Sequence, residues 1–138
     1  LGMEMQPKTF TPEEKEYARR ALADYKEIRP LVQQGEIYRL ISPYDGKGVA
    51  SLMYTNREKT QAVVYVYKMD HFVNQTLPLV RLEGLDTGRR YRIRELSVSG
   101  KPCRLDGLAL GGGALKDQGL DIPLNGEYAS RVFLLTAE

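Results

Sequence analysis

Tryptophan is absent from this chain of 138 residues, and cysteine and histidine each occur only once. Because Cys103 has no second cysteine to pair with, an intrachain disulfide and a multi-cysteine metal site are both excluded. This usage suits a reducing compartment and does not exclude a periplasmic one. A single histidine, His71, leaves almost no material for a Cys/His nucleophile pair or a histidine metal cluster. We therefore expect no metal-binding and no cofactor-binding residue.

Excess charge and long apolar runs are missing as well. The formal net charge is +2, which gives no strong attraction to nucleic acid or to a membrane surface. No stretch of about 18 apolar residues is present to span a bilayer, and the short polar N-terminus with Pro7 does not resemble a signal peptide. Cations do gather in residues 81–104, but such a run is usually the solvated face of a sheet. We expect neither a nucleic acid nor a membrane as a partner.

What is present is the composition of one globular domain whose first periodic segment is an amphipathic helix. Thr11 is a good N-cap, Pro12 suits the first helical position, and Glu14 completes a capping box. Pro30 predicts either a kink or a short second turn before Gly35, which serves as the C-terminal cap. The apolar residues recur at steps of three and four and share one stripe: Tyr17, Ala18, Ala21, Leu22, Tyr25, Ile28 and Val32.

From Glu36 onward the apolar period changes to two, which indicates strands. The segment Gln61–Lys68 is apolar on both faces, so it should be central or covered on both sides. The arginines of residues 90–94 alternate with Tyr91 and Ile93, which predicts one buried and one wet face. The predicted strands are Ile37–Ser42, Val49–Thr55, Gln61–Lys68, Leu77–Glu83, Arg90–Leu96, Leu105–Leu110 and Ala129–Thr136.

Turn signals separate these strands, and no helical segment is expected between them. The turns are expected at Asp45-Gly46, Asn56–Lys59, Asp86-Thr87-Gly88, Gly111–Gly113 and Asn125-Gly126. The predicted fold class is therefore mainly β: an antiparallel two-sheet β-sandwich of Greek-key type, preceded by one N-terminal α-helix.

No residue stands out as catalytic. His71 follows the central strand in a predicted loop, where a lone histidine is usually structural or solvated. The glycines Gly111–Gly113 lack the Lys-Ser/Thr pair of a phosphate-binding loop and are better explained as a flexible turn. The Asn74-Gln75-Thr76 sequon is a frequent chance match. The aspartates expected in turns suit turn stabilisation rather than acid–base chemistry: Asp45, Asp70, Asp86, Asp106 and Asp121.

Tyrosine is the most abundant aromatic, with nine tyrosines against three phenylalanines. Exposed aromatics on a sandwich can stack on sugar rings, but tyrosine is also a favoured strand residue that packs while keeping its hydroxyl in water. Most of these side chains lie in or beside predicted strands: Tyr38, Tyr44, Tyr54, Tyr65, Tyr67, Tyr91 and Tyr128.

Several segments, in this order, resemble family 36 glycoside hydrolases, the α-galactosidases. TPEEKEYARRALADYKEIRPLVQQG is similar to the last helix of the family's catalytic barrel, and GEIYRLISPYDG to the first strand and turn of its C-terminal domain. AVVYVYKM resembles the central strand of that domain, LVRLEGLDTGRRYRIRE its hairpin, and YASRVFLLTAE its closing strand. Residues 97–127 depart most from the family pattern.

The resemblance implies a domain that lacks the chemistry of its parent. Family members are retaining enzymes that use two barrel aspartates, with the nucleophile in a Lys-Trp-Asp motif. A chain without tryptophan cannot hold that motif, so no catalytic residue is carried over. The implied role is a non-catalytic C-terminal domain of an α-galactosidase that stabilises the barrel or its assembly. Its partner would be the catalytic barrel of the same parent chain, the galactoside being the parent's substrate and the parent a candidate homo-oligomer.

The expected organisation has three parts. Residues 1–10 form a loose leader in which Leu1-Gly2 resembles a cloning remnant, residues 11–35 form the barrel-like helix, and residues 36–138 form the β-sandwich. Two other functions stay open at this point. The sandwich could be a carbohydrate-binding module that uses exposed tyrosines, or its arginines could bind nucleic acid, which the weak net charge disfavours.

Overall fold

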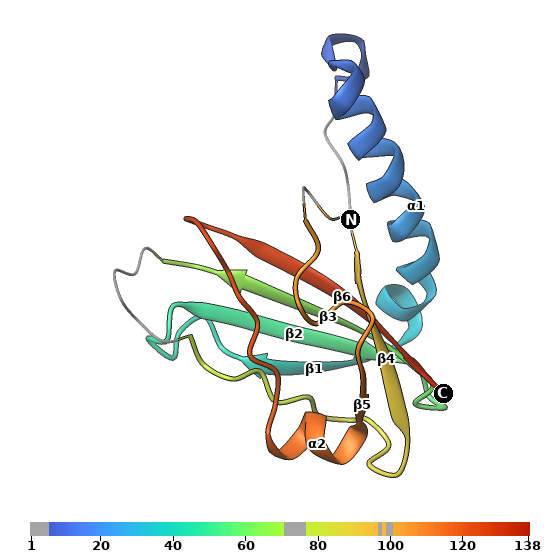
Figure 1. Cartoon of the computed structure of the whole chain (residues 1–138), viewed down its shortest axis with the longest axis vertical. Coiled ribbons are helices and arrows are strands. Elements are labelled where there is room, and N and C mark those ends of the chain that lie inside the picture. The colour runs from blue at the N-terminus through green and yellow to red at the C-terminus, as the bar shows by residue number, and fades with distance from the viewer. Residues whose placement is uncertain (1–5, 71–76, 97, 99–100) are drawn as a thin grey trace.

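The computed structural model describes residues 6–70, 77–96, 98 and 101–138, and it is built around one antiparallel sheet (Figure 1). Within the described residues this sheet has six strands in the order β1-β2-β3-β6-β4-β5. The strands are β1 (Glu36–Ile41), β2 (Val49–Thr55), β3 (Gln61–Lys68), β4 (Arg90–Leu96), β5 (Ala109–Gly111) and β6 (Ser130–Ala137). The helices are the 3-10 turn η1 (Pro7–Thr9), α1 (Pro12–Gln34) and α2 (Gly112–Asp117). The predicted mainly β antiparallel fold with one long N-terminal helix is confirmed.

Helix α1 begins and ends where its sequence signals predict. The Thr11 hydroxyl accepts from the Glu14 amide at 3.2 Å, and the Glu14 carboxylate accepts from the Thr11 amide at 2.8 Å. At the other end the Gly35 amide donates to the Leu31 carbonyl at 2.9 Å. The helix is continuous through Pro30, so the alternative of a short second turn is wrong. Pro30 is exposed, and water can therefore reach the carbonyl that its missing N–H leaves open.

One face of the sheet carries the main hydrophobic core. Met53, Val64, Tyr91, Phe133 and Leu135 each come from this face and are fully buried. As predicted, strand β3 is central, and it is covered on both sides, since both Val63 and Val64 have no exposed surface. Strand β4 also matches its prediction, with Tyr91 and Ile93 buried and the alternating arginines exposed.

The second layer of the predicted sandwich is present only in part as β-structure. It covers the core face with residues 77–85, with α2 and with the chain that follows α2, and Leu82, Leu115 and Leu120 pack into the core. The predicted strand Leu77–Glu83 is wrong, because among the described residues it forms only one isolated bridge, between Val80 and Leu120. Alternation along an extended segment follows from burial of every second side chain, whether or not a neighbouring strand pairs with it.

Two further predictions in this layer are wrong for identifiable reasons. The first half of the segment Leu105–Leu110 is a turn, in which Gly107 has φ +81°, and strand β5 begins only at Ala109. The glycines Gly111–Gly113 do not form a flexible turn, because Gly112 begins α2. A Cβ on Gly112 would lie 2.1 Å from the Asp86 carbonyl oxygen, so glycine is needed there for close backbone packing.

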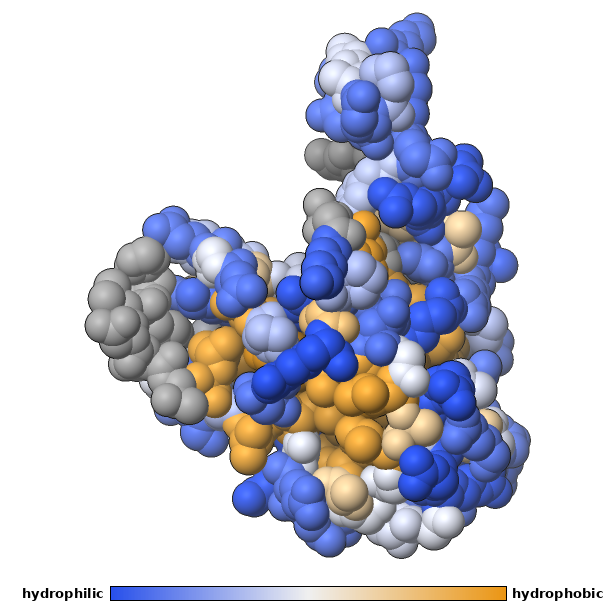
Figure 2. All heavy atoms as spheres, in the orientation of Figure 1, coloured by the Kyte–Doolittle hydropathy of each residue, from blue (hydrophilic) through white to orange (hydrophobic). Residues whose placement is uncertain are grey.

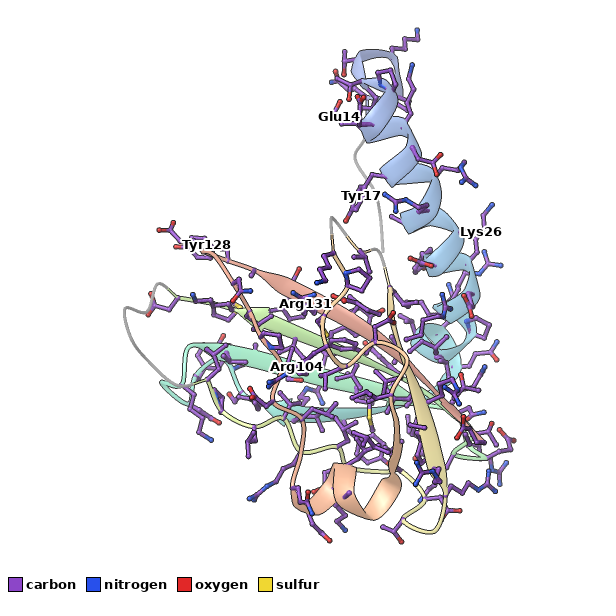
Figure 3. The ribbon with its side chains drawn as sticks, in the orientation of Figure 1. Glu14, Tyr17, Lys26, Arg104, Tyr128 and Arg131 are labelled. Atoms are coloured by element: carbon purple, nitrogen blue, oxygen red, sulfur yellow. The ribbon has the colours of Figure 1, made fainter. Side chains whose placement is uncertain are left out.

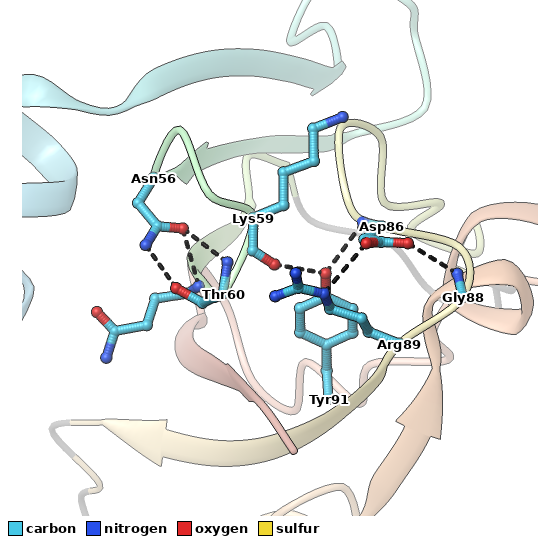
Figure 4. Close-up of polar contacts among 8 residues, drawn as sticks. Asn56, Lys59, Thr60, Asp86, Gly88, Arg89 and Tyr91 are labelled. Atoms are coloured by element: carbon cyan, nitrogen blue, oxygen red, sulfur yellow. Dashed lines mark hydrogen bonds and ion pairs between the residues drawn. The ribbon is translucent and has the colours of Figure 1, made fainter.

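Tyr91 joins two turns at one end of the core (Figure 4). Its hydroxyl donates to the Lys59 carbonyl at 2.7 Å and accepts from the Asp86 amide at 3.0 Å. The first turn is closed by Asn56, whose side-chain oxygen accepts from the Thr60 amide at 2.9 Å. The second is closed by Asp86, whose carboxylate accepts from the Gly88 amide at 2.9 Å. One buried hydroxyl therefore ties the β2–β3 hairpin to the turn before β4.

None of the helices in the described part of the chain is both long enough and apolar enough to cross a membrane.

Candidate interaction surface of α1 and the sheet

Four of the aspartates expected in turns make structural contacts in the described part of the chain. Asp86 closes its turn and pairs with Arg89 at 3.1 Å, and Asp106 accepts from the Glu95 amide at 2.7 Å. Asp45 pairs with Lys47 at 3.6 Å and Asp121 pairs with Arg104. Among the residues that the structure describes, no group of three or more His, Cys, Asp or Glu side chains is placed to hold a metal ion. His71 and the Asn74-Gln75-Thr76 sequon lie outside the described residues.

The arginines of residues 81–104 are largely engaged within the molecule. Arg94 pairs with Glu27 of α1 at 2.6 Å and approaches Asp24 at 3.8 Å, which fixes the helix against β4. Arg92 pairs with Glu138, and Arg90 donates to the Ala109 carbonyl at 2.8 Å. This run therefore behaves as a salt-bridged sheet face, and each exposed pair adds little stability.

A buried ion pair lies at the end of β4 and was not anticipated from the sequence. Glu95 accepts from Arg131 of β6 and from the Cys103 amide, the latter at 2.6 Å, and its side chain is almost entirely enclosed. Arg131 also donates through Nε to the Pro123 carbonyl at 2.7 Å. The pair fixes the chain around residues 103 and 123 to the sheet. No local pattern marks it, because Glu95 and Arg131 meet only when β4 pairs with β6.

The opposite face of the sheet packs on the C-terminal half of α1. A second apolar cluster forms there from Ile28 and Leu31 of α1 with Val63, Leu96 and Leu134 of the sheet. The N-terminal half of α1 rises clear of the strands (Figures 1 and 2). Tyr17 and Leu22 of this free half keep 41% and 37% of their surface exposed, so the apolar stripe of the helix is only partly used.

Three tyrosines continue this face of the sheet, and we call them the tyrosine face: Tyr54 of β2 with Tyr65 and Tyr67 of β3. Tyr54 meets Tyr65 edge-on with ring centroids 6.3 Å apart, and the Tyr65 and Tyr67 rings are nearly parallel at 6.4 Å. Burial, and then the nearby Tyr67, Tyr54 and Tyr25, raise the pKa of Tyr65 to about 12. Burial also raises the pKa of Tyr67. These hydroxyls therefore remain proton donors throughout the physiological range.

A groove of about 400 Å³ lies between the free half of α1 and the sheet, and we call it the notch. Tyr17 of α1 lines it, and its other lining residues are both polar and apolar: Glu95, Leu96, Val98, Asn125, Ala129, Ser130, Arg131 and Val132. Figure 3 shows Tyr17 pointing from α1 toward the side of β6, whereas Lys26 points the opposite way. Val132 and Ser130 pair across the sheet with Tyr65 and Tyr67, so the notch and the tyrosine face are continuous.

Comparison with known proteins gives consistent matches. Residues 49–135 match the glycosyl hydrolase family 36 C-terminal domain. The chain is 35% identical over 100 residues to α-galactosidase AgaA of Geobacillus stearothermophilus, covering 72% of this chain and 14% of that protein. It is 30% identical over 139 residues to a probable α-galactosidase G of Emericella nidulans, covering 100% of this chain and 17% of that protein.

A solved structure agrees with the sequence matches. The family 36 α-galactosidase AgaB of Geobacillus stearothermophilus superposes with a TM-score of 0.79 and 30% identity, covering 95% of this chain and 17% of that chain. The chain thus spans about a sixth of the length of such relatives. The similarity extends to α1, which lies before the matched domain, and to most of the divergent segment 97–127.

Proposed function

This chain belongs to the family of glycoside hydrolase family 36 C-terminal domains, and from that membership we propose that it is the non-catalytic C-terminal domain of an α-galactosidase. The observation that carries the proposal is the agreement of sequence and fold, over nearly the whole chain, with about one sixth of α-galactosidase chains. The parent would hydrolyse terminal α-galactosides with retention, using two aspartates of its catalytic barrel.

The proposed division of labour follows from what this chain can supply. It contains no tryptophan, so it cannot provide the Lys-Trp-Asp motif that carries the nucleophile in the family. Its described turn aspartates are engaged in local contacts rather than facing one another as an acid and a nucleophile would. The chain is left with a structural role, in which it stabilises the barrel or the assembly of the parent.

The geometry of α1 supports this structural role. An amphipathic helix is stable when its apolar stripe is buried, yet only the C-terminal half of the α1 stripe packs on this sheet. We propose that residues 11–35 belong structurally to the barrel and residues 36–138 to the β-domain, with Gly35 at their boundary. The helix would then be shared between two packing partners.

The gene offers a direct test of this proposal. The reading frame upstream of the codon for Leu1 should encode a catalytic barrel that contains a Lys-Trp-Asp strand. A frame that instead encodes an unrelated domain, or a barrel without that motif, would contradict the assignment to an α-galactosidase.

A second candidate function is carbohydrate binding, because Tyr54, Tyr65 and Tyr67 share one partly exposed face. A crystal structure of an AgaA variant from Geobacillus stearothermophilus contains raffinose, which makes this sugar a suitable probe. Calorimetric titration of the chain with raffinose and melibiose distinguishes the two functions. A purely structural domain releases no binding heat, whereas a saturable heat that is lost in Tyr67→Ala and kept in Tyr128→Ala would favour the binding module.

A further inference from the structure

We propose that Asn125 is a site of spontaneous covalent modification, at which its side-chain amide is lost as ammonia and the bond to Gly126 rearranges. The reaction requires water and no enzyme, and it goes beyond the proposed function because every reacting group lies in this chain. The Asn125-Gly126 pair follows Leu124 of the core and leads through a turn into β6. Figure 3 shows Tyr128 of this turn at the outer edge of the molecule.

The chemistry is an intramolecular attack of main chain on side chain. The backbone nitrogen of Gly126, after losing its proton, attacks the side-chain carbonyl carbon of Asn125. A carbon–nitrogen bond forms, the bond from that carbon to the side-chain nitrogen breaks, and this nitrogen leaves as ammonia. Water then opens the cyclic succinimide at either ring carbonyl. The products are aspartate and isoaspartate, and nothing is oxidised or reduced. Asparagine is among the thermolabile residues for this reason.

The attacking nitrogen and its target are not engaged by the fold. Asn125 and Gly126 are both exposed. Among the described residues, neither the Asn125 side chain nor the Gly126 amide makes a hydrogen bond to the protein. Gly126 is held through its carbonyl instead, which accepts from Lys68 Nζ at 3.0 Å. The Gly126 amide is therefore available to lose its proton to solvent and to attack.

The residue after Asn125 offers no steric barrier. Gly126 has φ +91°, and a Cβ built on it would meet nothing within 4 Å. The surrounding space is open, and glycine moves through φ/ψ space at little steric cost. The backbone nitrogen can therefore approach the Asn125 side-chain carbonyl carbon without displacing other atoms.

Asn56 shows how the same fold protects an asparagine. Its side-chain oxygen accepts from the Thr60 amide at 2.9 Å and from the Gln61 amide at 3.0 Å. Its side-chain nitrogen donates to the Thr60 hydroxyl at 2.7 Å (Figure 4). Cyclisation at Asn56 would break these hydrogen bonds, and the next residue, Arg57, carries a long side chain where Asn125 has a glycine. Asn56 is therefore the internal control.

The modification changes both the charge and the main chain of this turn. Asn125 lines the notch together with Glu95 and Arg131, so a new carboxylate appears on a groove that already holds an ion pair. Replacing a neutral amide with an acid lowers the formal net charge of +2 by one unit. An isoaspartate also lengthens the main chain by one carbon, directly before the residue whose carbonyl Lys68 holds.

The test incubates the folded 138-residue chain and a synthetic peptide of residues 121–130 in the same mildly alkaline buffer. Peptide mapping by mass spectrometry follows each asparagine with time. Asn125 of the folded chain should convert to separable aspartate and isoaspartate forms at a rate within a few-fold of the free peptide. The rate should rise with pH, since the deprotonated amide attacks, and Asn56 should stay unmodified. Asn125→Gln is the matched variant and should form far less acidic product, because its ring would be larger.

Three outcomes would contradict the proposal. Conversion in the free peptide without conversion in the folded chain would show that the fold shields Asn125. Equal conversion of Asn56 and Asn125 in the folded chain would show that the free amide and the open turn do not decide reactivity. An acidic form that accumulates equally in Asn125→Gln would place the modification at another residue.

Discussion

At the scale of single residues, Tyr91 shows how one polar group can organise a largely apolar core. Its ring is fully buried against Phe133 and the second layer, and its hydroxyl bridges the Lys59 carbonyl and the Asp86 amide. Both partners lie in turns, so the hydroxyl fixes backbone that regular strand pairing does not reach. The alternation around Tyr91 predicts its burial. The sequence does not indicate that the Lys59 carbonyl accepts its hydrogen bond, because the two residues are 32 positions apart.

Removing this hydroxyl should destabilise the domain. Tyr91→Phe leaves the partly buried Lys59 carbonyl and Asp86 amide without their partner, which costs about 1 kcal/mol of unfolding free energy. Urea titration of the 138-residue chain measures this loss. Tyr44→Phe, at a side chain that is 94% exposed, is the control and should stay within about 0.5 kcal/mol of the unchanged protein. Equal midpoints for the two variants would contradict the role of the hydroxyl.

The raised pKa of Tyr65 predicts that the stability of the folded chain falls at high pH. Its pKa is raised from 10.0 to about 12 in the folded chain, so the folded state holds the phenol proton more tightly than the unfolded state. The associated stability is complete below pH 10 and is lost as the pH rises toward 12. Unfolding free energies measured across this range should fall less steeply for Tyr65→Phe than for the unchanged chain. Parallel slopes would show that Tyr65 does not titrate in this way.

At the scale of elements, Gly35 joins α1 to β1 in a space that admits no side chain. Its φ of −77° is available to any residue, so the requirement for glycine is steric. A Cβ at this position would lie 2.4 Å from the Leu31 carbonyl oxygen and 2.8 Å from that of Thr55. The end of the helix and the end of β2 therefore approach closely at this point.

Gly35→Ala should accordingly destabilise the chain by about 1–3 kcal/mol, since backbone atoms on both sides must move. Thermal or urea unfolding measures the effect. Gly111→Ala is the matched control: its φ is −69° and a Cβ there meets nothing within 4 Å, so no loss is expected. A larger loss at Gly111 than at Gly35 would refute the steric explanation.

The elements also show what the sequence could predict and what it could not. The caps of α1 and the limits of β2, β3 and β4 follow from local signals, and the structure reproduces them. Leu31 was not assigned to the helical stripe, yet it is buried, because the sheet lies to that side of the last turns of α1. The second layer eluded prediction for a related reason: residues 77–83 alternate because they cover a core, not because they pair in a sheet.

The candidate surface was less predictable than the fold. The stripe of α1 and the two apolar faces of β3 can be recognised in the sequence, which indicates that something must cover both. Where they meet depends on how α1 lies on the sheet, at the close approach of Gly35 to β2 and at the packing of Ile28 and Leu31 on Val63, Leu96 and Leu134. Such long-range placement has no local signature.

At the scale of the whole molecule, the domain has one sheet face closed by its own second layer and the other closed only where α1 reaches it. The closed face holds the larger apolar cluster, and α1 packs on a smaller cluster of the other face. This asymmetry supports the proposed function, which rests on the agreement of sequence and fold with α-galactosidases.

The central claim is that this chain is a non-catalytic part of an α-galactosidase, and hydrolysis of an aryl α-galactoside tests it most directly. Purified 138-residue chain and full-length parent are compared at equal molar concentration. The account predicts turnover by the parent and none above the buffer rate by the chain. Measurable turnover by the chain alone, or none by the parent, would contradict it.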